Sequence, residues 1–207
     1  MSSDIRDTLR FLQTENARLQ ENNRDLKEEN AKLQRVLKVL ETLLDLSNTV
    51  NAETSVIGLL DRILESALTG IDAAAGSLLL MDEDTRELVF TVVHGASSEK
   101  IINFRLPPGS GLVGWVAQNG KPVIIANARN DPRFSPTVDE QFDFSTHSFM
   151  CVPLATPRKI MGVLTALNKS DGKEFNPADL ALLAIVAQLS ALTMERAENA
   201  IPVGSGQ

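Results

Sequence analysis

The chain has 207 residues, 43% of them hydrophobic and 23% charged, and its formal net charge at neutral pH is −7. This composition is typical of a globular protein, and the sequence has no uninterrupted apolar run of about 18 residues that would span a membrane. The N-terminal sequence MSSDIRDT lacks both the apolar centre of a signal peptide and the basic stretch of a DNA-binding zipper, so we expect a cytoplasmic protein that binds neither membrane nor nucleic acid.

Leucine recurs every seven residues along the N-terminal segment, and a second series interleaves four residues after the first. Three members of the second series are asparagines, which at position a of a coiled coil are satisfied by their symmetry mates. Leucine at d with asparagine at a favours two parallel strands, so the pattern predicts a parallel homodimer. A single amphipathic helix packed on its own domain is the alternative. The residues assigned to the dimer seam are Leu9, Leu12, Asn16, Leu19, Asn23, Leu26, Asn30, Leu33, Leu37, Leu40 and Leu44.

The heptad pattern ends near Ser47, and the remainder has the length of one globular domain. We expect a coiled coil over residues 1–46, a globular domain over 47–198 and a flexible tail over 199–207. Within the domain, apolar residues at helical spacing predict a helix over 55–71, with Asn51 as a candidate cap.

Two short apolar runs follow the first helix, at residues 76–82 and 87–95, and a charged turn separates them. They predict a β-hairpin. The sequence SGLVGWVAQNG then predicts a short helix capped by the Ser110 side chain and ended by Gly120 in a left-handed conformation. The remaining expected elements are a strand over 122–128, a polar loop with one short helix over 129–148, strands over 148–156 and 159–169, and a helix from the cap Asn176 to about Glu198.

This order of elements predicts an α+β fold, in which an antiparallel sheet is covered by helices. The first and last helices of the domain are expected to pack side by side on one face of the sheet. The short helix and the polar loop then cover the other face, and we expect a cavity beneath them.

Three blocks of the sequence resemble successive blocks of the GAF domain family: GLVGWVAQNGKPVIIANARNDPRF, STHSFMCVPL and GVLTALNKSDGKEFNPADLALL. The resemblance implies a six-stranded antiparallel sheet with helices on both faces and a buried small-molecule pocket. It also implies that a signal passes through dimeric helices to an output domain, either fused or separate. The identity of a ligand or cofactor stays unknown at this point.

The cyclic-nucleotide-binding branch of this family has an Asn-Lys pair followed by Phe, three residues, Asp and Glu. The chain matches at Asn168, Lys169, Phe175 and Asp179 but has Leu180 where that branch has Glu. The resemblance implies a structural ion pair between the lysine and the aspartate. The departure at Leu180 weakens the case for cyclic AMP or cyclic GMP, which is kept as an alternative.

Candidate ligand contacts come from the expected short helix, the polar loop and the strand ends. His147 is a candidate to hydrogen-bond a ligand or bind haem iron, and Trp115 to form a pocket wall, with core packing as its alternative. Arg105 and Arg133 are candidates to meet an anionic group, although exposed arginine is the usual finding. The full candidate set is Arg105, Trp115, Asn127, Arg133, Phe134, Phe142, Thr146, His147 and Phe149.

The residues that could support catalysis are few. Cys151 lies in an apolar run, where a thiol behaves as a small hydrophobe, and two histidines are too few for a three-histidine metal site. The sequence also lacks the nucleophile elbow of serine hydrolases. We therefore expect a sensory module rather than an enzyme, with no metal, and a ligand-free interaction module is the alternative.

Overall fold

The computed structural model describes residues 8–27, 30, 34, 37, 56–96 and 98–200, with side chains to Ala197. The chain divides into two compact units, Met1–Lys38 and Val39–Gln207. In the first unit residues 8–27 are helical, and the described leucines of the heptad pattern are each more than half exposed in the single chain. Leu33, Leu40, Leu44 and the proposed cap Asn51 lie outside the described residues.

Six strands form one sheet in the order β3-β2-β1-β6-β5-β4. All five neighbouring pairs are antiparallel, which confirms the predicted α+β architecture. The strands are β1 (Ala73–Met81), β2 (Leu88–His94), β3 (Arg105–Leu106), β4 (Val123–Ile125), β5 (Phe149–Ala155) and β6 (Ile160–Lys169).

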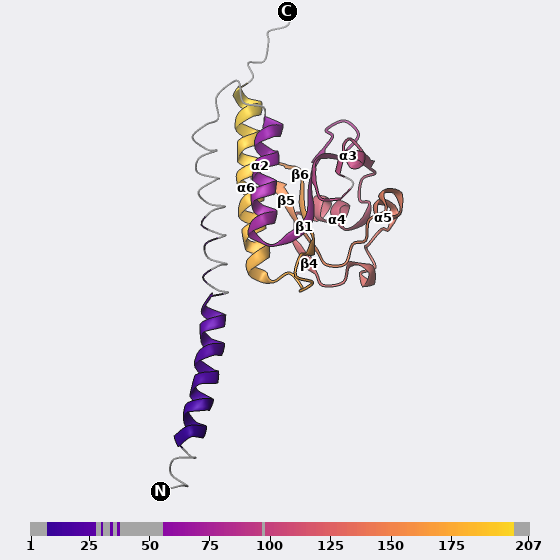
Figure 1. Ribbon diagram of the computed structural model, residues 1–207. Coiled ribbons are helices and arrows are strands. Elements are labelled where there is room, and N and C mark those ends of the chain that lie inside the picture. The colour runs from indigo at the N-terminus through magenta and orange to yellow at the C-terminus, as the bar shows by residue number, and fades with distance from the viewer. Residues whose placement is uncertain are drawn as a thin grey trace, which may run out of the picture. The chain divides into compact units, whose positions relative to one another are not determined.

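Helices cover both faces of the sheet. The helices α2 (Val56–Gly70) and α6 (Pro177–Ala200) lie side by side on one face, as expected for the first and last helices of the domain (Figure 1). On the other face lie α3 (Ser98–Ile101), α4 (Gly111–Asn119) and α5 (Thr137–Phe142) (Figure 1). A 3₁₀ turn, η1 (Ala128–Asn130), follows β4.

The central strands are buried on both faces, because helices cover both faces of the sheet and successive side chains of a strand point to opposite faces. Phe149 and Cys151 on β5 belong to the cluster that includes α4, whereas the intervening Met150 points the other way and is also buried. The same alternation holds on β6 for Val163 and Leu164. This double burial explains why β5 and β6 are near-continuous apolar runs in the sequence.

The helix α6 is apolar around most of its circumference. Its residues Pro177–Ala197 are long and apolar enough to cross a membrane, as the core helix of a globular protein also can be, and 44% of an 18-residue apolar stretch within them is buried inside the fold. The helix packs against β5, β6 and α2, and its buried residues include Leu183, Val186 and Ala191. Contact with the sheet and with α2 therefore explains why the side of α6 that faces them is apolar.

Several boundaries differ from the sequence predictions. β1 begins at Ala73 rather than residue 76, because pairing of Ala73 with Lys169 on β6 overrides the low strand propensity of alanine. β4 ends at Ile125, since the chain turns into η1, where the Ala128 amide donates to the His147 carbonyl. The short elements α3 and β3 were not predicted, because runs of four and two residues carry no detectable periodicity.

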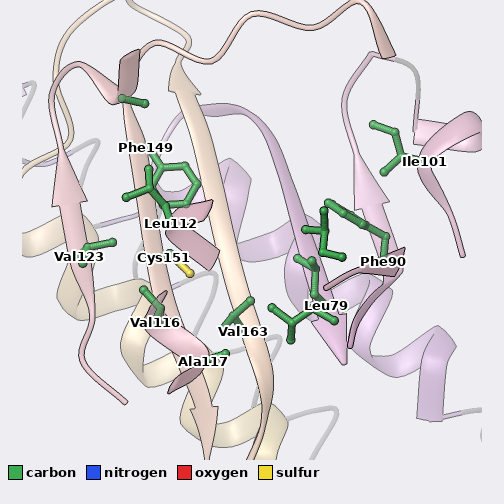
Figure 2. Close-up of a cluster of buried hydrophobic side chains, with 13 residues drawn as sticks. Leu79, Phe90, Ile101, Leu112, Val116, Ala117, Val123, Phe149, Cys151 and Val163 are labelled. Atoms are coloured by element: carbon green, nitrogen blue, oxygen red, sulfur yellow. The ribbon is translucent and has the colours of Figure 1, made fainter. Parts of the chain in front are cut away.

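Cys151 lies inside the buried cluster beneath α4, close to Leu112 and Val116 (Figure 2). Burial raises the pKa of its thiol well above the ordinary value, so the thiol stays protonated. We expect a thiol-specific disulfide reagent to leave the native protein unlabelled and to label one thiol per chain in denaturant. Rapid labelling of the native protein would contradict this packing.

The β1–β2 turn holds a carboxylate with a depressed pKa. The Thr85 backbone amide and the Arg105 guanidinium, 2.9 Å away, lower the pKa of Asp82 from 3.8 to about 2. The contacts of ionised Asp82 therefore stabilise the folded state above the pKa that Asp82 has in the unfolded chain, and this stabilisation is lost as the pH falls toward 2. A carboxyl NMR titration should give a midpoint near 2 in the native chain. Arg105→Gln should raise it only part of the way, because the amide contact remains; an unchanged midpoint in the variant would contradict this assignment.

Candidate functional site

A cavity of about 100 Å³ lies between the sheet and the cover formed by α4, α5 and their loops. The sheet contributes residues of β1, β2, β3, β5 and β6, and the cover contributes Ser110–Val113 at the start of α4 and much of the segment 134–146. Most of the lining is apolar, including Phe90, Leu112 and Phe134. The structure thus contains the cavity predicted beneath the second cover.

The cavity floor carries two buried hydroxyl groups on neighbouring central strands. Ser77 on β1 and Thr165 on β6 are partners in the sheet register and are 4% and 2% exposed. Their hydroxyl oxygens lie 2.8 Å apart, and the Ser77 amide donates to Thr165 Oγ1 at 3.0 Å. Both side chains line the cavity, so the floor is polar at one point in an apolar surface.

A buried carboxylate fixes the wall opposite the sheet. Asp139 on α5 is 5% exposed and accepts hydrogen bonds from the Thr146 hydroxyl at 2.7 Å and from its backbone amide at 2.8 Å. The Arg129 guanidinium lies 3.4 Å from the same carboxylate. These contacts tie α5 to the chain just before β5 and hold both Asp139 and Thr146 against the cavity.

The position of α4 depends on a close backbone approach. A Cβ atom at Gly114 would lie 2.4 Å from the carbonyl carbon of Gly109, so only glycine lets the preceding turn contact the helix. Gly120 ends the helix at φ 63°, and its amide donates to the Val116 carbonyl, as predicted. The Ser110 side chain makes no capping hydrogen bond and instead lines the cavity, so the predicted side-chain cap is wrong.

One cavity residue contacts the helix on the far side of the sheet. His94 ends β2 and lines the cavity, and its Nε2 lies 2.9 Å from the Asp61 Oδ1 on α2. The pair is half-buried, with the His94 side chain 28% exposed. The cavity wall is therefore joined directly to α2 by a polar contact.

Three of the nine predicted ligand contacts line the cavity, namely Phe134, Thr146 and Phe149. The two predicted arginines do not line the cavity, because each forms ion pairs with carboxylates outside it. Arg105 pairs with Asp82 and Glu87 at 2.9 Å, and Arg133 forms a two-point contact with Asp131. The predicted role of these arginines in meeting an anionic ligand is not supported by their placement.

The other four predicted contacts also lie outside the cavity lining. Trp115 packs against the core edge with the Arg133 guanidinium 4.5 Å from its ring centroid, and Phe142 stacks edge-on against Phe104. Asn127 is exposed at the start of η1. His147 is exposed as well, and its backbone amide donates to the Asn168 side chain at 2.8 Å.

The residues of the Asn-Lys motif form a structural cluster outside the cavity lining. Lys169 Nζ lies 2.6 Å from Asp179 Oδ2, with the two side chains 10% and 4% exposed, and lies 5.7 Å from the Phe175 ring centroid. Asn176 Oδ1 accepts the Asp179 amide, and Asp179 Oδ2 accepts the Asn176 amide, which is a reciprocal helix cap. Asn168, at φ 55°, ties the end of β6 to the loop before β5.

Three buried polar residues of the cavity lining were not predicted from the sequence: Ser77, Thr165 and Asp139. A signal for the first two was present: each is one polar residue inside an apolar strand, at a position that the alternation places on a buried face. Asp139 carried no such signal, because a carboxylate in a polar loop is ordinary.

In the part of the chain that the structure describes, no three side chains of His, Cys, Asp or Glu converge as metal ligands. The cavity offers hydroxyl groups and one carboxylate in a largely apolar surface, because the His94 imidazole contacts Asp61 on α2 instead. Such a lining is suited to holding a small molecule.

Comparisons with known proteins agree with this geometry. The GAF domain family matches residues 53–195. The chain is 26% identical to nitrogen fixation protein VnfA of Azotobacter vinelandii over 163 residues, covering 77% of the chain and 31% of that protein. It is 27% identical to the probable 3',5'-cyclic phosphodiesterase pde-5 of Caenorhabditis elegans over 187 residues, covering 86% of the chain and 25% of that protein. The chain thus spans about a third or less of the length of these curated relatives.

Solved structures share the fold. The GAF domain of a phosphoenolpyruvate-protein phosphotransferase from Coxiella burnetii superposes with a TM-score of 0.68 at 22% identity, covering 79% of this chain and 96% of that one. Free methionine-R-sulfoxide reductase from Neisseria meningitidis superposes with a TM-score of 0.64 at 21% identity, covering 80% of this chain and 93% of that one. The chain therefore belongs to the GAF domain family of signalling and sensory domains.

Proposed function

We propose that the chain is a dimeric regulatory module in which a small molecule in the cavity alters the packing of the dimer helices. The observation that carries this proposal is the position of the cavity. Its floor is built from β1 and β6, and the opposite faces of these strands pack against α2 and α6. A change in the floor therefore reaches helices that flank the domain in the sequence.

A direct contact supports the same route. His94 lines the cavity, and its Nε2 contact with Asp61 bridges the sheet to α2. A ligand shifts the equilibrium between two helix arrangements only to the extent that it binds one of them more tightly. Movement of β2 against α2 would supply that difference in affinity.

The dimer is proposed from the heptad pattern of the N-terminal segment, with a coiled coil over 1–46, the sensory domain over 47–198 and a tail over 199–207. Leu19 and Leu26, 57% and 64% exposed, supply an apolar seam for a second copy. Asparagine at position a favours the parallel direction. Leu9→Cys should form a disulfide between two parallel chains under mild oxidation, and an antiparallel pair would not form it. An output domain, fused or separate, would receive the signal.

Cyclic nucleotide binding is the alternative ligand assignment. It is favoured by the similarity to pde-5 and by the ion pair of Lys169 with Asp179. Two observations weigh against it. The cavity, at about 100 Å³, is smaller than the roughly 300–1,000 Å³ of pockets for larger ligands. Neither lysine nor arginine is among its lining residues to meet a cyclic phosphate.

Thermal-shift and calorimetric measurements with cyclic nucleotides, 2-oxo acids, haem and amino acids test the proposal. A compound at ~100 times its Kd adds about 2.7 kcal/mol of stability and raises the Tm by about 5–10 °C. Val93→Phe, which fills the cavity from β2, should remove that rise, whereas Ile124→Phe on the 37% exposed β4 position should keep it. If no compound stabilises the native chain, the ligand-free interaction module is favoured instead.

A further inference from the structure

The hydrogen-bond inventory of the cavity floor indicates what a ligand must supply. Two hydroxyl groups, Ser77 Oγ and Thr165 Oγ1, carry two hydrogens and four acceptor positions. Thr165 Oγ1 accepts the Ser77 amide at 3.0 Å and is 3.3 Å from the Ser77 carbonyl, to which it can donate. The remaining contact joins the two hydroxyl oxygens at 2.8 Å.

One arrangement uses both hydroxyl hydrogens. Thr165 donates to the Ser77 carbonyl, and Ser77 donates to Thr165, whose two acceptor positions are then filled by the Ser77 amide and hydroxyl. Ser77 Oγ is left as an acceptor that receives no hydrogen bond from any residue that the structure describes. Because this oxygen lines the cavity and its residue is 4% exposed, only a molecule inside the cavity can reach it.

The charges around the cavity select against an anionic ligand. The lining includes Asp139, whose carboxylate is paired with Arg129 at 3.4 Å, but neither lysine nor arginine, and Arg105 and Arg133 are paired with other carboxylates. A negative group would lose its hydration on entering the cavity, and no lysine or arginine lines the cavity to compensate that cost. The backbone amides at the start of α4 are the opposing influence, since helix N-termini favour negative charge.

We infer that the cavity takes a neutral, largely apolar small molecule that donates one hydrogen bond to Ser77 Oγ. This inference rests on the proposed sensory function and names the ligand class of that site. The apolar walls bind the body of the molecule, and the hydroxyl pair on the floor selects its orientation. An alcohol, phenol, amide or indole has the required donor.

Titration of the full chain with phenol, toluene and benzoate, followed by protein NMR, tests the inference. Phenol and toluene are nearly isosteric and differ in the donor, whereas benzoate supplies the negative charge. We expect phenol to bind about tenfold more tightly than toluene, as one net hydrogen bond implies, and benzoate to bind more weakly than both.

Ser77→Ala should reduce phenol affinity to the level of toluene without changing toluene affinity. Ser190→Ala is the matched control, because the buried Ser190 hydroxyl on α6 donates to the Val186 carbonyl outside the cavity lining. Equal affinities for phenol and toluene, a preference for benzoate, or no binding of any probe would overturn the inference. The sensory function would still stand if a compound of the wider panel stabilised the chain in a manner that Val93→Phe abolishes.

Discussion

Leu19→Glu is expected to convert the chain from a dimer to a monomer at micromolar concentration. Leu19 occupies position d of the proposed seam, and each dimer buries two copies of it. Burial of a leucine contributes about 1.5–3 kcal/mol, so loss of both copies raises the dimer Kd at least ~100-fold. The two new carboxylates facing each other add repulsion to this loss. Sedimentation equilibrium of the full chain measures the change.

Ala17→Glu is the matched control, because residue 17 falls at heptad position b, on the outer face of the coiled coil. It adds the same charge two residues away, and the chain should remain dimeric. A native chain that sediments as single molecules would rule out the seam. A dimer that survives Leu19→Glu would show that the chains associate through another surface.

Asp179→Ala is expected to lower the free energy of unfolding by about 3–5 kcal/mol, because it leaves the ammonium group of Lys169 buried without its carboxylate. The two side chains are 10% and 4% exposed, and their charged atoms lie 2.6 Å apart. The substitution also removes the acceptor for the Asn176 amide at the start of α6. Urea unfolding followed by circular dichroism measures the loss.

Asp171→Ala supplies the exposed counterpart, since Asp171 pairs with Lys173 at 3.2 Å and the two side chains are 42% and 73% exposed. Its cost should stay below about 1 kcal/mol. The double variant Lys169→Met/Asp179→Ala should be more stable than Asp179→Ala alone, because no unpaired charge remains. Equal losses for Asp171→Ala and Asp179→Ala would contradict the role assigned to the buried pair.

The larger elements of the fold follow from local chemistry that is visible in the sequence. The period changes from helical in α2 to strand-like in β1 and β2, and the reciprocal cap of Asn176 and Asp179 marks the start of α6. Gly120 marks the end of α4. These signals depend on residues close together in the chain, so they can be recognised without knowing which distant residues come into contact.

The ligand contacts were harder to predict, because they depend on partners distant in the chain. Arg105 is neutralised by Asp82 and Glu87, which β-sheet pairing brings together across 23 and 18 residues. Ser77 and Thr165 meet across 88 residues. No local pattern in the sequence predicts either pairing. The candidate ligand contacts chosen from the sequence were therefore mainly aromatic and cationic residues, and the two small hydroxyl residues were not among them.

The Ala and Ile methyl NMR spectrum of the full chain, titrated with the small-molecule fraction of a cell extract, tests most directly whether cavity and helices form one unit. Ala75 and Ile101 report on the cavity, and the exposed Ile57 and Ile185 report on α2 and α6. We expect saturable shifts of all four methyl groups together, and we expect Val93→Phe to abolish them. Cavity methyls that never shift, or that shift while Ile57 and Ile185 stay unchanged, would contradict it.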